Sequence, residues 1–352
     1  MTRAEIAAHL PGPGALRTLL FGAAGGVVFW LAGLPIPWLT GPIAVTAALA
    51  VAGIRVEAMP QVRPVIFVVL GISIGAAVGP DTLVQMVRWP ASMAMLLVFL
   101  PVTILVMYGY FRLISRADAA TALMSAVPGN LSYVLAYSAD VGADMRRVVV
   151  TQSVRLVILI FVVPLAVAPT LVTAAEVAPP SDGLAQAWLF AVAASVGALS
   201  AWRWKLPAAP LIGAMLASSV LHASGLNQAY LPDAAIDVCL VALGCMVGAR
   251  FHGMRREELV RVALVGVGAV AVSLALSAGF ALAVARMVGI GFAQAMVAFS
   301  PGGVEAMTLI AVTLDLDPAY VGAHHIARML IVPALIPVLA RFLVKPAAVT
   351  AK

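Results

Sequence analysis

The sequence predicts an all-α polytopic membrane protein made of two inverted-topology repeats, from its composition, an internal duplication and the placement of its basic residues. The chain has 352 residues, of which 63% are hydrophobic and 10% are charged, with a mean hydropathy of +1.08. Soluble proteins average about 45–50% apolar and about 25% charged residues. A chain this apolar and this long is typical of a protein that crosses a membrane many times.

The apolar residues gather in segments that each suit a membrane helix. The segments cover residues 16–33, 35–54, 64–80, 90–111, 119–139, 148–175, 184–201, 206–224, 233–249, 259–285, 290–313 and 322–344. We expect an N-terminal cytoplasmic segment (1–15), a first membrane repeat (16–175), a connecting loop (176–183), a second membrane repeat (184–345) and a C-terminal tail (346–352).

Three pairs of motifs, in the same order, indicate a duplication. LPIPWLTG (34–41) matches LPAAPLIG (206–213), and GISIG (71–75) matches GCMVG (244–248). The stretch from 127 to 155 matches the stretch from 300 to 328 at a constant offset of 173 residues. The two glycine motifs have the GxxxG spacing that lets membrane helices approach closely.

The basic residues indicate the relative orientation of the repeats. If all twelve segments crossed, the 21 Lys and Arg would divide into ten inside, nine outside and two within segments, Arg155 and Arg328. If segments 119–139 and 290–313 instead enter and leave on one side, the division is seventeen inside and two outside. Cytoplasmic loops carry an excess of basic residues. The charges therefore favour five crossings and one Pro-Gly-broken re-entrant or interrupted helix per repeat, with the second repeat inverted.

The two Pro-Gly segments are the predicted substrate site. Irregular backbone survives at membrane depth only where protein buries it or where it lines a watery cavity. Inverted repeats with broken helices are the architecture of secondary transporters, and the half-helix after each break presents a positive dipole end to an anion. A plain Pro-Gly kink between packed helices is the alternative. The substrate-binding candidates are Pro128, Gly129, Asn130, Ser132, Pro301, Gly302 and Gly303.

Arg155 and Arg328 occupy matched positions in the segments after the breaks. An arginine within a membrane segment costs about 2.5–3.5 kcal/mol on insertion scales, so it should face the protein interior and have a partner. We expect either a clamp on a substrate anion or a structural ion pair with a nearby carboxylate.

Ion coupling has three candidates, Glu305, His324 and Thr151. Glu305 is the one carboxylate well inside a Pro-Gly segment, so it is suited to bind H⁺ or Na⁺ or to neutralise Arg328. His324 and Thr151 lie four residues before the arginines, which places each pair on one helix face. His324 is suited either to relay protons or to pack as a gate residue. Asp144 and Asp317 are interpreted as helix N-caps.

Other kinds of site have little support in the sequence. No basic patch carries interleaved aromatic residues, which argues against nucleic-acid binding. Cys239 and Cys245 are interpreted as buried apolar thiols. No metal-ligand spacing and no pair of a nucleophile and a base is visible, so we expect no cofactor, no metal and no enzyme activity.

The duplicated unit ending in PGG…E.M…D.D…..H..R resembles the AbrB family of bacterial membrane proteins, which shares only a name with the soluble sporulation regulator. The resemblance runs from Leu34 to about Leu339. The first copy departs from the motif at Asn130 and Ser132, so we expect an asymmetric ligand site. Members have carried the labels regulator and ammonia monooxygenase, which no DNA-binding module or copper-ligand set in this sequence supports.

The sequence therefore favours a secondary transporter or exporter of a small organic anion. Its expected partners are the anion, H⁺ or Na⁺ and the lipid bilayer, with a homo-oligomer also possible. The expected location is the bacterial inner membrane, with both termini in the cytoplasm. A membrane-bound regulator that affects gene expression without transport is the alternative.

Overall fold

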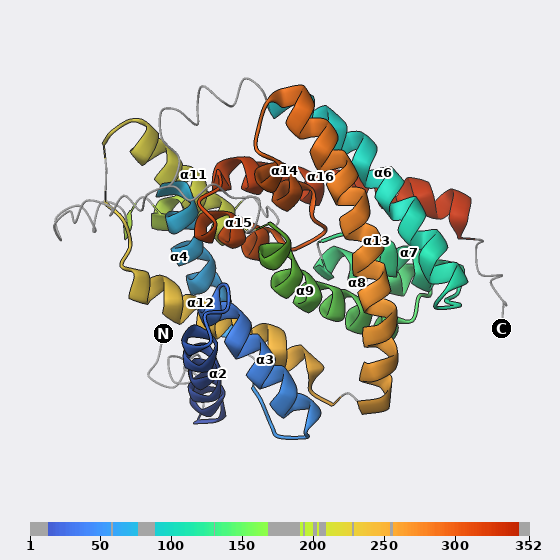
Figure 1. The fold of residues 1–352 in the computed structure, drawn as a ribbon, viewed down its shortest axis with the longest axis horizontal. Helices are drawn as coiled ribbons and strands as arrows, with labels where there is room; N and C mark the ends of the chain where they lie inside the picture. The colour runs from blue at the N-terminus through green and yellow to red at the C-terminus, as the bar shows by residue number, and fades with distance from the viewer. Residues whose placement is uncertain are drawn as a thin grey trace. The chain divides into compact units, whose positions relative to one another are not determined.

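The computed structural model describes residues 13–57, 59–76, 89–129, 131–167, 191–192, 194–199, 203, 209–226, 229–253 and 256–344. Every element within these ranges is helical, which confirms the all-α class (Figure 1). Residues 1–12 of the predicted N-terminal segment 1–15 lie outside the described residues, as do the predicted connecting loop 176–183, the predicted tail 346–352 and Asn130.

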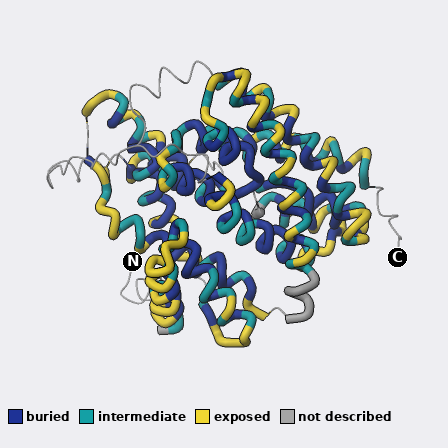
Figure 2. Tube along the Cα trace, viewed as in Figure 1, coloured by how far each residue is buried: buried dark blue, intermediate teal, exposed yellow. Residues whose placement is uncertain are grey.

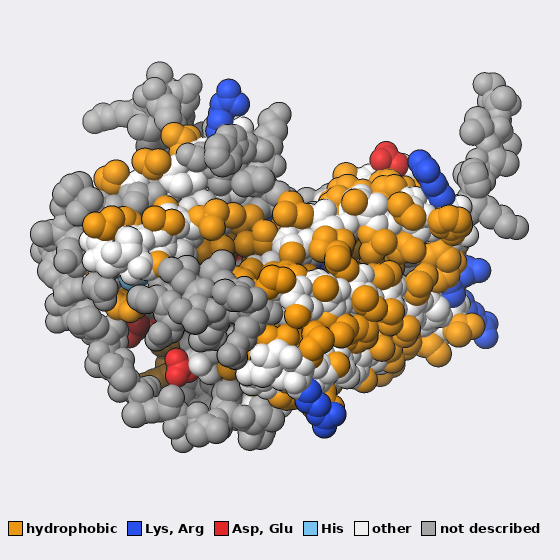
Figure 3. Space-filling view, turned by 90° about the horizontal axis from the view of Figure 1, so that it is seen from above, with side chains coloured by type: hydrophobic (Ala, Val, Ile, Leu, Met, Phe, Trp, Pro, Cys, Tyr) orange, Lys and Arg blue, Asp and Glu red, His pale blue; other side chains and the backbone are white. Residues whose placement is uncertain are grey.

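Within the described part of the chain, six helices are long and apolar enough to cross a membrane, and the protein is therefore a multi-pass membrane protein. These candidate spans are Gly14–Leu31, Trp89–Leu113, Met145–Val167, Asp233–Phe251, Val262–Val288 and Pro318–Leu343. Large apolar side chains face outward along them, as at Leu97 and Val267, each 55% exposed. Hydrophobic side chains cover much of the visible surface in Figure 3, as expected for contact with lipid.

The chain divides into two compact units, each built from parts of both halves of the sequence. Unit 1 covers residues 1–84, 172–256 and 317–319, and unit 2 covers 85–171, 257–316 and 320–352. The described elements of unit 1 are α2 (Pro13–Leu31), α3 (Pro37–Val51), η1 (Pro60–Val62), α4 (Arg63–Ala76), α11 (Ala209–Ala223), α12 (Asp233–Gly248) and η4 (Ala249–Phe251).

Unit 1 is held together by close helix crossings at the GxxxG glycines. Helix α4 packs on α11 and α12 packs on α3. A Cβ atom added at Gly71 would lie 2.5 Å from the Leu211 carbonyl oxygen, and one added at Gly244 would lie 2.7 Å from the Leu39 carbonyl oxygen. The residue pairs are equivalent, because Leu39 and Leu211 match in the duplicated motif LPIPWLTG and LPAAPLIG. Each half of the sequence thus supplies one helix with a GxxxG motif and one helix against which the other half's motif packs, as expected for motifs that bring helices close.

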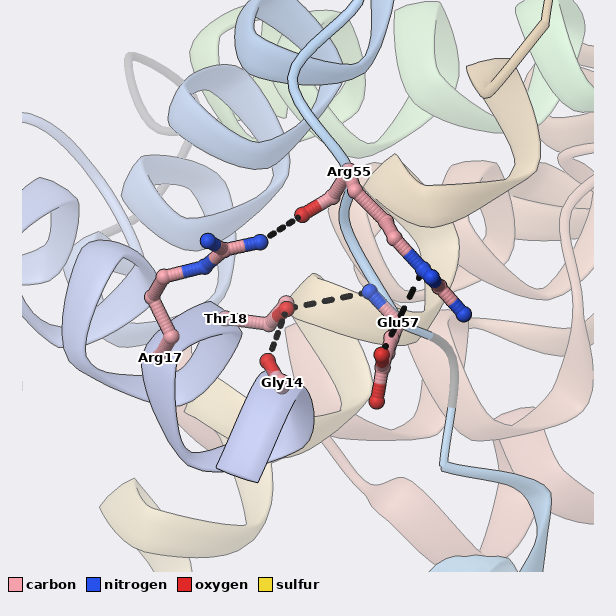
Figure 4. A network of polar contacts seen from close by, with 5 residues as sticks. All are labelled: Gly14, Arg17, Thr18, Arg55 and Glu57. Atoms are coloured by element: carbon pink, nitrogen blue, oxygen red, sulfur yellow. Dashed lines mark hydrogen bonds and ion pairs between the residues drawn. The ribbon is translucent and has the colours of Figure 1, made fainter. Parts of the chain in front are cut away.

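A polar network joins the start of α2 to the segment that follows α3 (Figure 4). The Thr18 hydroxyl donates to the Gly14 carbonyl at 3.0 Å and accepts from the Glu57 amide at 3.0 Å. Arg17 donates to the Arg55 carbonyl at 2.8 Å, and the Arg55 Nε atom lies 3.5 Å from a Glu57 carboxylate oxygen. The arginine contacts are solvent-exposed, so they order this loop and add little stability.

Unit 2 contains two helices that break at a Pro-Gly sequence. Its elements are α6 (Trp89–Leu113), α7 (Ala119–Ala126), α8 (Leu131–Asp140), α9 (Met145–Val167), α13 (Arg256–Val288), α14 (Phe292–Phe299), α15 (Val304–Thr313) and α16 (Pro318–Leu343). We call α7–α8 the first broken helix and α14–α15 the second broken helix. Most residues of α7, α14 and α15 are buried, as Figure 2 shows for the α14–α15 region.

The breaks follow from local chemistry. A residue before proline is pushed out of the helical region, and proline has no N–H to donate. Val127, before Pro128, has ψ 126°, and Ser300, before Pro301, has ψ 139°. Both helices therefore end at these residues, and the predicted breaks are confirmed.

Candidate functional site

The two breaks of unit 2 lie against each other. A Cβ atom added at Gly129 would lie 3.9 Å from the Gly302 carbonyl oxygen. Gly129 has φ +76°, a left-handed conformation that glycine adopts without steric cost. Pro128, Pro301 and Gly302 are buried, whereas Gly303 is half-buried. The structure thus brings together the predicted tip residues of both repeats, except Asn130, which is not described.

The second broken helix exposes main-chain carbonyls at its break, and side chains from other helices bind them. Arg328 donates from Nη1 to the Ser300 carbonyl at 2.9 Å and from Nη2 to the Ala298 carbonyl at 3.3 Å. His325 Nε2 lies 3.2 Å from the Val297 carbonyl. The Ser277 hydroxyl of α13 donates to the Phe299 carbonyl at 3.0 Å. The last carbonyls of α14 are therefore satisfied inside the protein, as the bilayer demands.

The first broken helix is held by the equivalent positions of α9. Arg155 donates from Nη2 to the Val127 carbonyl at 3.1 Å and from Nη1 to the Ser125 carbonyl at 3.5 Å. Gln152 Nε2 donates to the Met124 and Val127 carbonyls at 3.0 and 2.9 Å. With the offset of 173 residues, the contacts of Arg155 with Val127 and Ser125 and that of Gln152 with Met124 have counterparts around Arg328 and His325.

Within each set, the arginine also binds the side chain three residues before it. Arg155 donates to the Gln152 Oε1 atom. Arg328 Nη2 lies 2.7 Å from His325 Nδ1. We define Gln152 and Arg155 as the first latch, and His325 and Arg328 as the second latch, because each pair ties a broken helix to the helix that follows it.

Neither Arg155 nor Arg328 forms an ion pair with a carboxylate of the described residues. The two guanidiniums also repel each other through space. Arg328 is 1% exposed, and its Nε atom has no hydrogen-bond partner among the described residues. An unpaired donor next to two buried positive charges would attract an anion.

Glu305 does not serve as the counterion of Arg328. It lies in the first turn of α15 and is half-buried. A Cβ atom added at Gly303 would lie 3.2 Å from its Oε2 atom, so the carboxylate sits at the start of the half-helix. A negative charge there interacts favourably with the helix dipole.

The remaining candidates lie at the ends and faces of α9 and α16. His324 is fully buried and bonds away from Arg328, to the Ser92 hydroxyl at 2.8 Å and the Tyr320 carbonyl at 2.8 Å. Thr151 is buried on α9. Ser132 lies on α8, and its side chain is not described. Asp144 accepts from the Arg147 amide and Asp317 from the Ala319 amide, which confirms both as helix N-caps.

Sequence reasoning did not single out Gln152 and His325, which complete the latches, or Ser277 of α13, which binds the Phe299 carbonyl. The i,i+4 rule pointed to His324 and Thr151, but the structure uses the i−3 position of each arginine instead. The repeat alignment already paired Gln152 with His325, and this shared polar character at a matched position was the available signal.

Comparison with known proteins identifies the family of the chain. Residues 38–344 match the family described as "Transition state regulatory protein AbrB". The chain belongs to the AbrB family. It is 29% identical over 359 residues to the "Uncharacterized protein YhjN" of Bacillus subtilis, covering 91% of each chain. It is 28% identical over 323 residues to the "Putative regulator AbrB" of Escherichia coli, covering 88% of this chain and 90% of the relative.

Proposed function

We propose that this AbrB family member is a secondary transporter or exporter of a small organic anion. The observation that carries the proposal is the meeting of two broken helices at buried arginines without a neutralising carboxylate among the described residues. Broken helices buried at membrane depth expose backbone groups that transporters use to bind substrate and coupling ions.

The two halves of the chain are proposed to be inverted repeats. Swapped packing supports this, since α4 of the first half packs on α11 of the second while α12 of the second half packs on α3 of the first. The two latches of unit 2 also support it, because Arg155 binds the Val127 carbonyl as Arg328 binds the Ser300 carbonyl. The seventeen-to-two division of basic residues favours the inversion.

The proposed anion site lies between the tips Gly129 and Gly302, within reach of Arg155 and Arg328. Each guanidinium has five N–H donors, and the contacts described above occupy three of them on each arginine. The start of α8 adds its positive dipole end. Glu305 already occupies the start of α15, so the two halves of the site differ in charge. The anion is therefore proposed to bind closer to the first broken helix.

Flux measurements test the transport proposal directly. Purified protein in proteoliposomes should accumulate or release at least one radiolabelled small mono-, di- or tricarboxylate under an imposed H⁺ or Na⁺ gradient. Gly129→Val, which fills the contact between the tips, should abolish flux. Arg341→Ala, an exposed position near the end of α16, should leave it unchanged. Absence of flux for the whole panel under both gradients would overturn the proposal.

Cysteine labelling tests the inverted topology. In a background without Cys239 and Cys245, single cysteines at the exposed positions Arg146 and Thr313 should react with impermeant reagents from opposite sides of the membrane. Reaction of both from one side would contradict the inversion.

A membrane-bound regulator is the second candidate, favoured by the printed name of the Escherichia coli relative. This reading predicts that deletion of the gene alters transcript levels while proteoliposomes show no flux. A transcript change that disappears when the transported acid is supplied or removed would instead be a consequence of transport.

A further inference from the structure

The second latch contains a titratable side chain, and the first does not. The partners of His325 fix its protonation state. A carbonyl oxygen can only accept, so Nε2 must carry the hydrogen donated to Val297. Arginine can only donate, and Arg328 Nη2 lies 2.7 Å from Nδ1 and 3.3 Å from Nε2, so the nearer Nδ1 must be the bare nitrogen that accepts from it. The second latch therefore requires a neutral His325 in one tautomer. Gln152 makes the same two kinds of bond with an amide, which does not titrate.

A proton on Nδ1 is incompatible with the latched geometry. Both ring nitrogens of a charged imidazole are donors, so Nδ1–H would face the Arg328 Nη2 donor at the position where it now accepts. Two positive charges would also meet in a site that is 1–2% exposed. Release of Arg328 from the ring would relieve both conflicts.

No negatively charged group among the described residues is placed to neutralise a protonated His325. On its own helix the groups that act on it are Arg328 and His324. Arg155 of α9 acts on Arg328. Helix α14, which His325 contacts, carries no titratable side chain in its sequence FAQAMVAF, and α13 contributes the Ser277 hydroxyl nearby. Glu305 of α15 lies beside Gly303. Within the described residues, nothing is placed to neutralise an imidazolium.

We infer that His325 is the proton-binding site of this protein, and that a proton on Nδ1 releases Arg328 and loosens the second broken helix. This inference rests on the proposed transport function, because only a transporter uses the bound H⁺ as a coupling ion. Proton binding and latching exclude each other, so acid shifts the population towards the released state. The second broken helix would then be the moving, proton-driven one, and the first the fixed one.

Hydrogen exchange measures the latch without knowledge of the substrate. Purified wild-type protein in lipid nanodiscs is compared at pH 8 and pH 5, with exchange rates corrected for the intrinsic effect of pH. A water-exposed histidine titrates near pH 6.5, so the released population, and the exchange of residues 296–303, should rise about 30-fold at pH 5. Residues 123–127 of the first broken helix should not change.

Two variants locate the effect. His325→Gln copies the first latch and should keep protection while losing its pH dependence. His324→Gln, the matched control one residue away, should retain the 30-fold change. If His325→Gln fails to fold, Gln152→His supplies the reciprocal test, because it should make residues 123–127 acid-sensitive. The inference is overturned if the hydrogen exchange of residues 296–303 in the wild type does not depend on pH, or if its pH dependence survives His325→Gln. It is also overturned if the exchange of residues 123–127 in Gln152→His does not depend on pH.

The outcome is separable from that of the transport proposal. If no acid is transported but the second latch opens in acid, the transport proposal fails and the proton site stands. If flux occurs and its pH dependence survives His325→Gln, the proton site fails and the transporter stands.

Discussion

The first and second latches bind the same kind of backbone break with different numbers of donors. In the first latch, the Val127 carbonyl accepts from both Gln152 and Arg155, and the Ser125 carbonyl is also within 3.5 Å of both side chains. In the second latch, Ser300 and Ala298 receive hydrogen bonds from Arg328, while His325 serves Val297. The two latches therefore share their geometry but differ in the number of side-chain donors. At the first break, Gln152 is a second side-chain donor to both carbonyls that Arg155 binds, whereas at the second break Arg328 is the one side-chain donor to Ser300 and Ala298 among the described residues.

Removing each arginine is the strongest test of this comparison. Arg328→Ala leaves the buried Ala298 carbonyl without its side-chain donor, whereas the Ser300 carbonyl keeps the Gly302 amide at 2.9 Å, so we expect a loss of about 1–3 kcal/mol. Arg155→Ala should cost about half as much, because Gln152 still reaches Ser125 and Val127. Relief of the repulsion between the guanidiniums offsets part of the loss in both variants, so the difference between them is the informative quantity.

Thermal unfolding in detergent, with Arg341→Ala as the control on the same helix, measures this difference. The exposed control should stay within about 0.5 kcal/mol of wild type. Equal losses for Arg155→Ala and Arg328→Ala would contradict the claim that the latches differ in redundancy.

The sequence predicted the breaks and the burial of the arginines, but it did not predict their partners. Pro128 and Pro301 set the breaks through local sterics, and a charged group inside an apolar segment must face protein, so both features can be deduced from one segment at a time. The partners of Arg155 and Arg328 are backbone carbonyls of another helix, which no side-chain pattern records. An arginine was therefore matched with a carboxylate, Glu305, that the structure places elsewhere.

The choice between His324 and His325 depended on helix rotation. Residues at i−3 and i−4 both lie on the face of Arg328, and about 100° of rotation separates the two histidines. The packing of α16 against α14 decides which of the two histidines reaches Arg328, and the sequence of α16 alone does not reveal that packing. The substrate, by contrast, remains a proposal because the same carbonyl-binding arginines would serve several small anions.

Unit 1 offers a comparison in which the two halves should behave alike. Gly71→Ala and Gly244→Ala each force a Cβ atom to within 2.5–2.7 Å of a carbonyl oxygen on the neighbouring helix. Such overpacking costs about 1–3 kcal/mol, and the equivalence of the two crossings predicts similar losses. Gly109→Ala on α6 is the matched control, because no atom lies within 4 Å of its added Cβ.

Unfolding measurements on these three variants would decide the point. A large loss for one crossing glycine and none for the other would show that the swapped packing is not symmetric in energy.

The polar cluster around His324 joins α6 of the first half to α16 of the second half, and it gives a smaller effect. Ser92→Ala removes a buried hydroxyl that bonds His324 and the Tyr320 hydroxyl, so we expect a loss of about 1–3 kcal/mol, towards the lower end. Thr103→Val on the same helix is the control. Its buried hydroxyl has no hydrogen-bond partner among the described residues, so the apolar isostere should be neutral or stabilising in a thermal melt. A destabilising Thr103→Val together with a neutral Ser92→Ala would contradict this assignment.

The starts of the two broken helices should differ most weakly, and in a pH-dependent way. Asp118 caps α7 by accepting from the Thr121 amide at 2.9 Å, whereas the equivalent cap of α14 is Gly291, which has no side chain. Burial raises the pKa of Asp118, but hydrogen bonds from Thr121 and neighbouring main-chain amides outweigh it and leave the pKa below its ordinary value of 3.8. A carboxylate with a lowered pKa stabilises the fold above the unfolded pKa, and this contribution is lost as the pH falls through the folded one.

Asp118→Ala should therefore cost about 1 kcal/mol at pH 7 and progressively less below about pH 4. Asp118→Asn should retain most of the cap at pH 7, because the amide oxygen can accept the same hydrogen bond. Thermal melts of both variants and wild type between pH 3 and pH 7 measure the effect. A loss for Asp118→Ala that stays constant down to pH 3 would mean that the charge contributes nothing. The first broken helix would then be anchored at its start by the hydrogen bond alone.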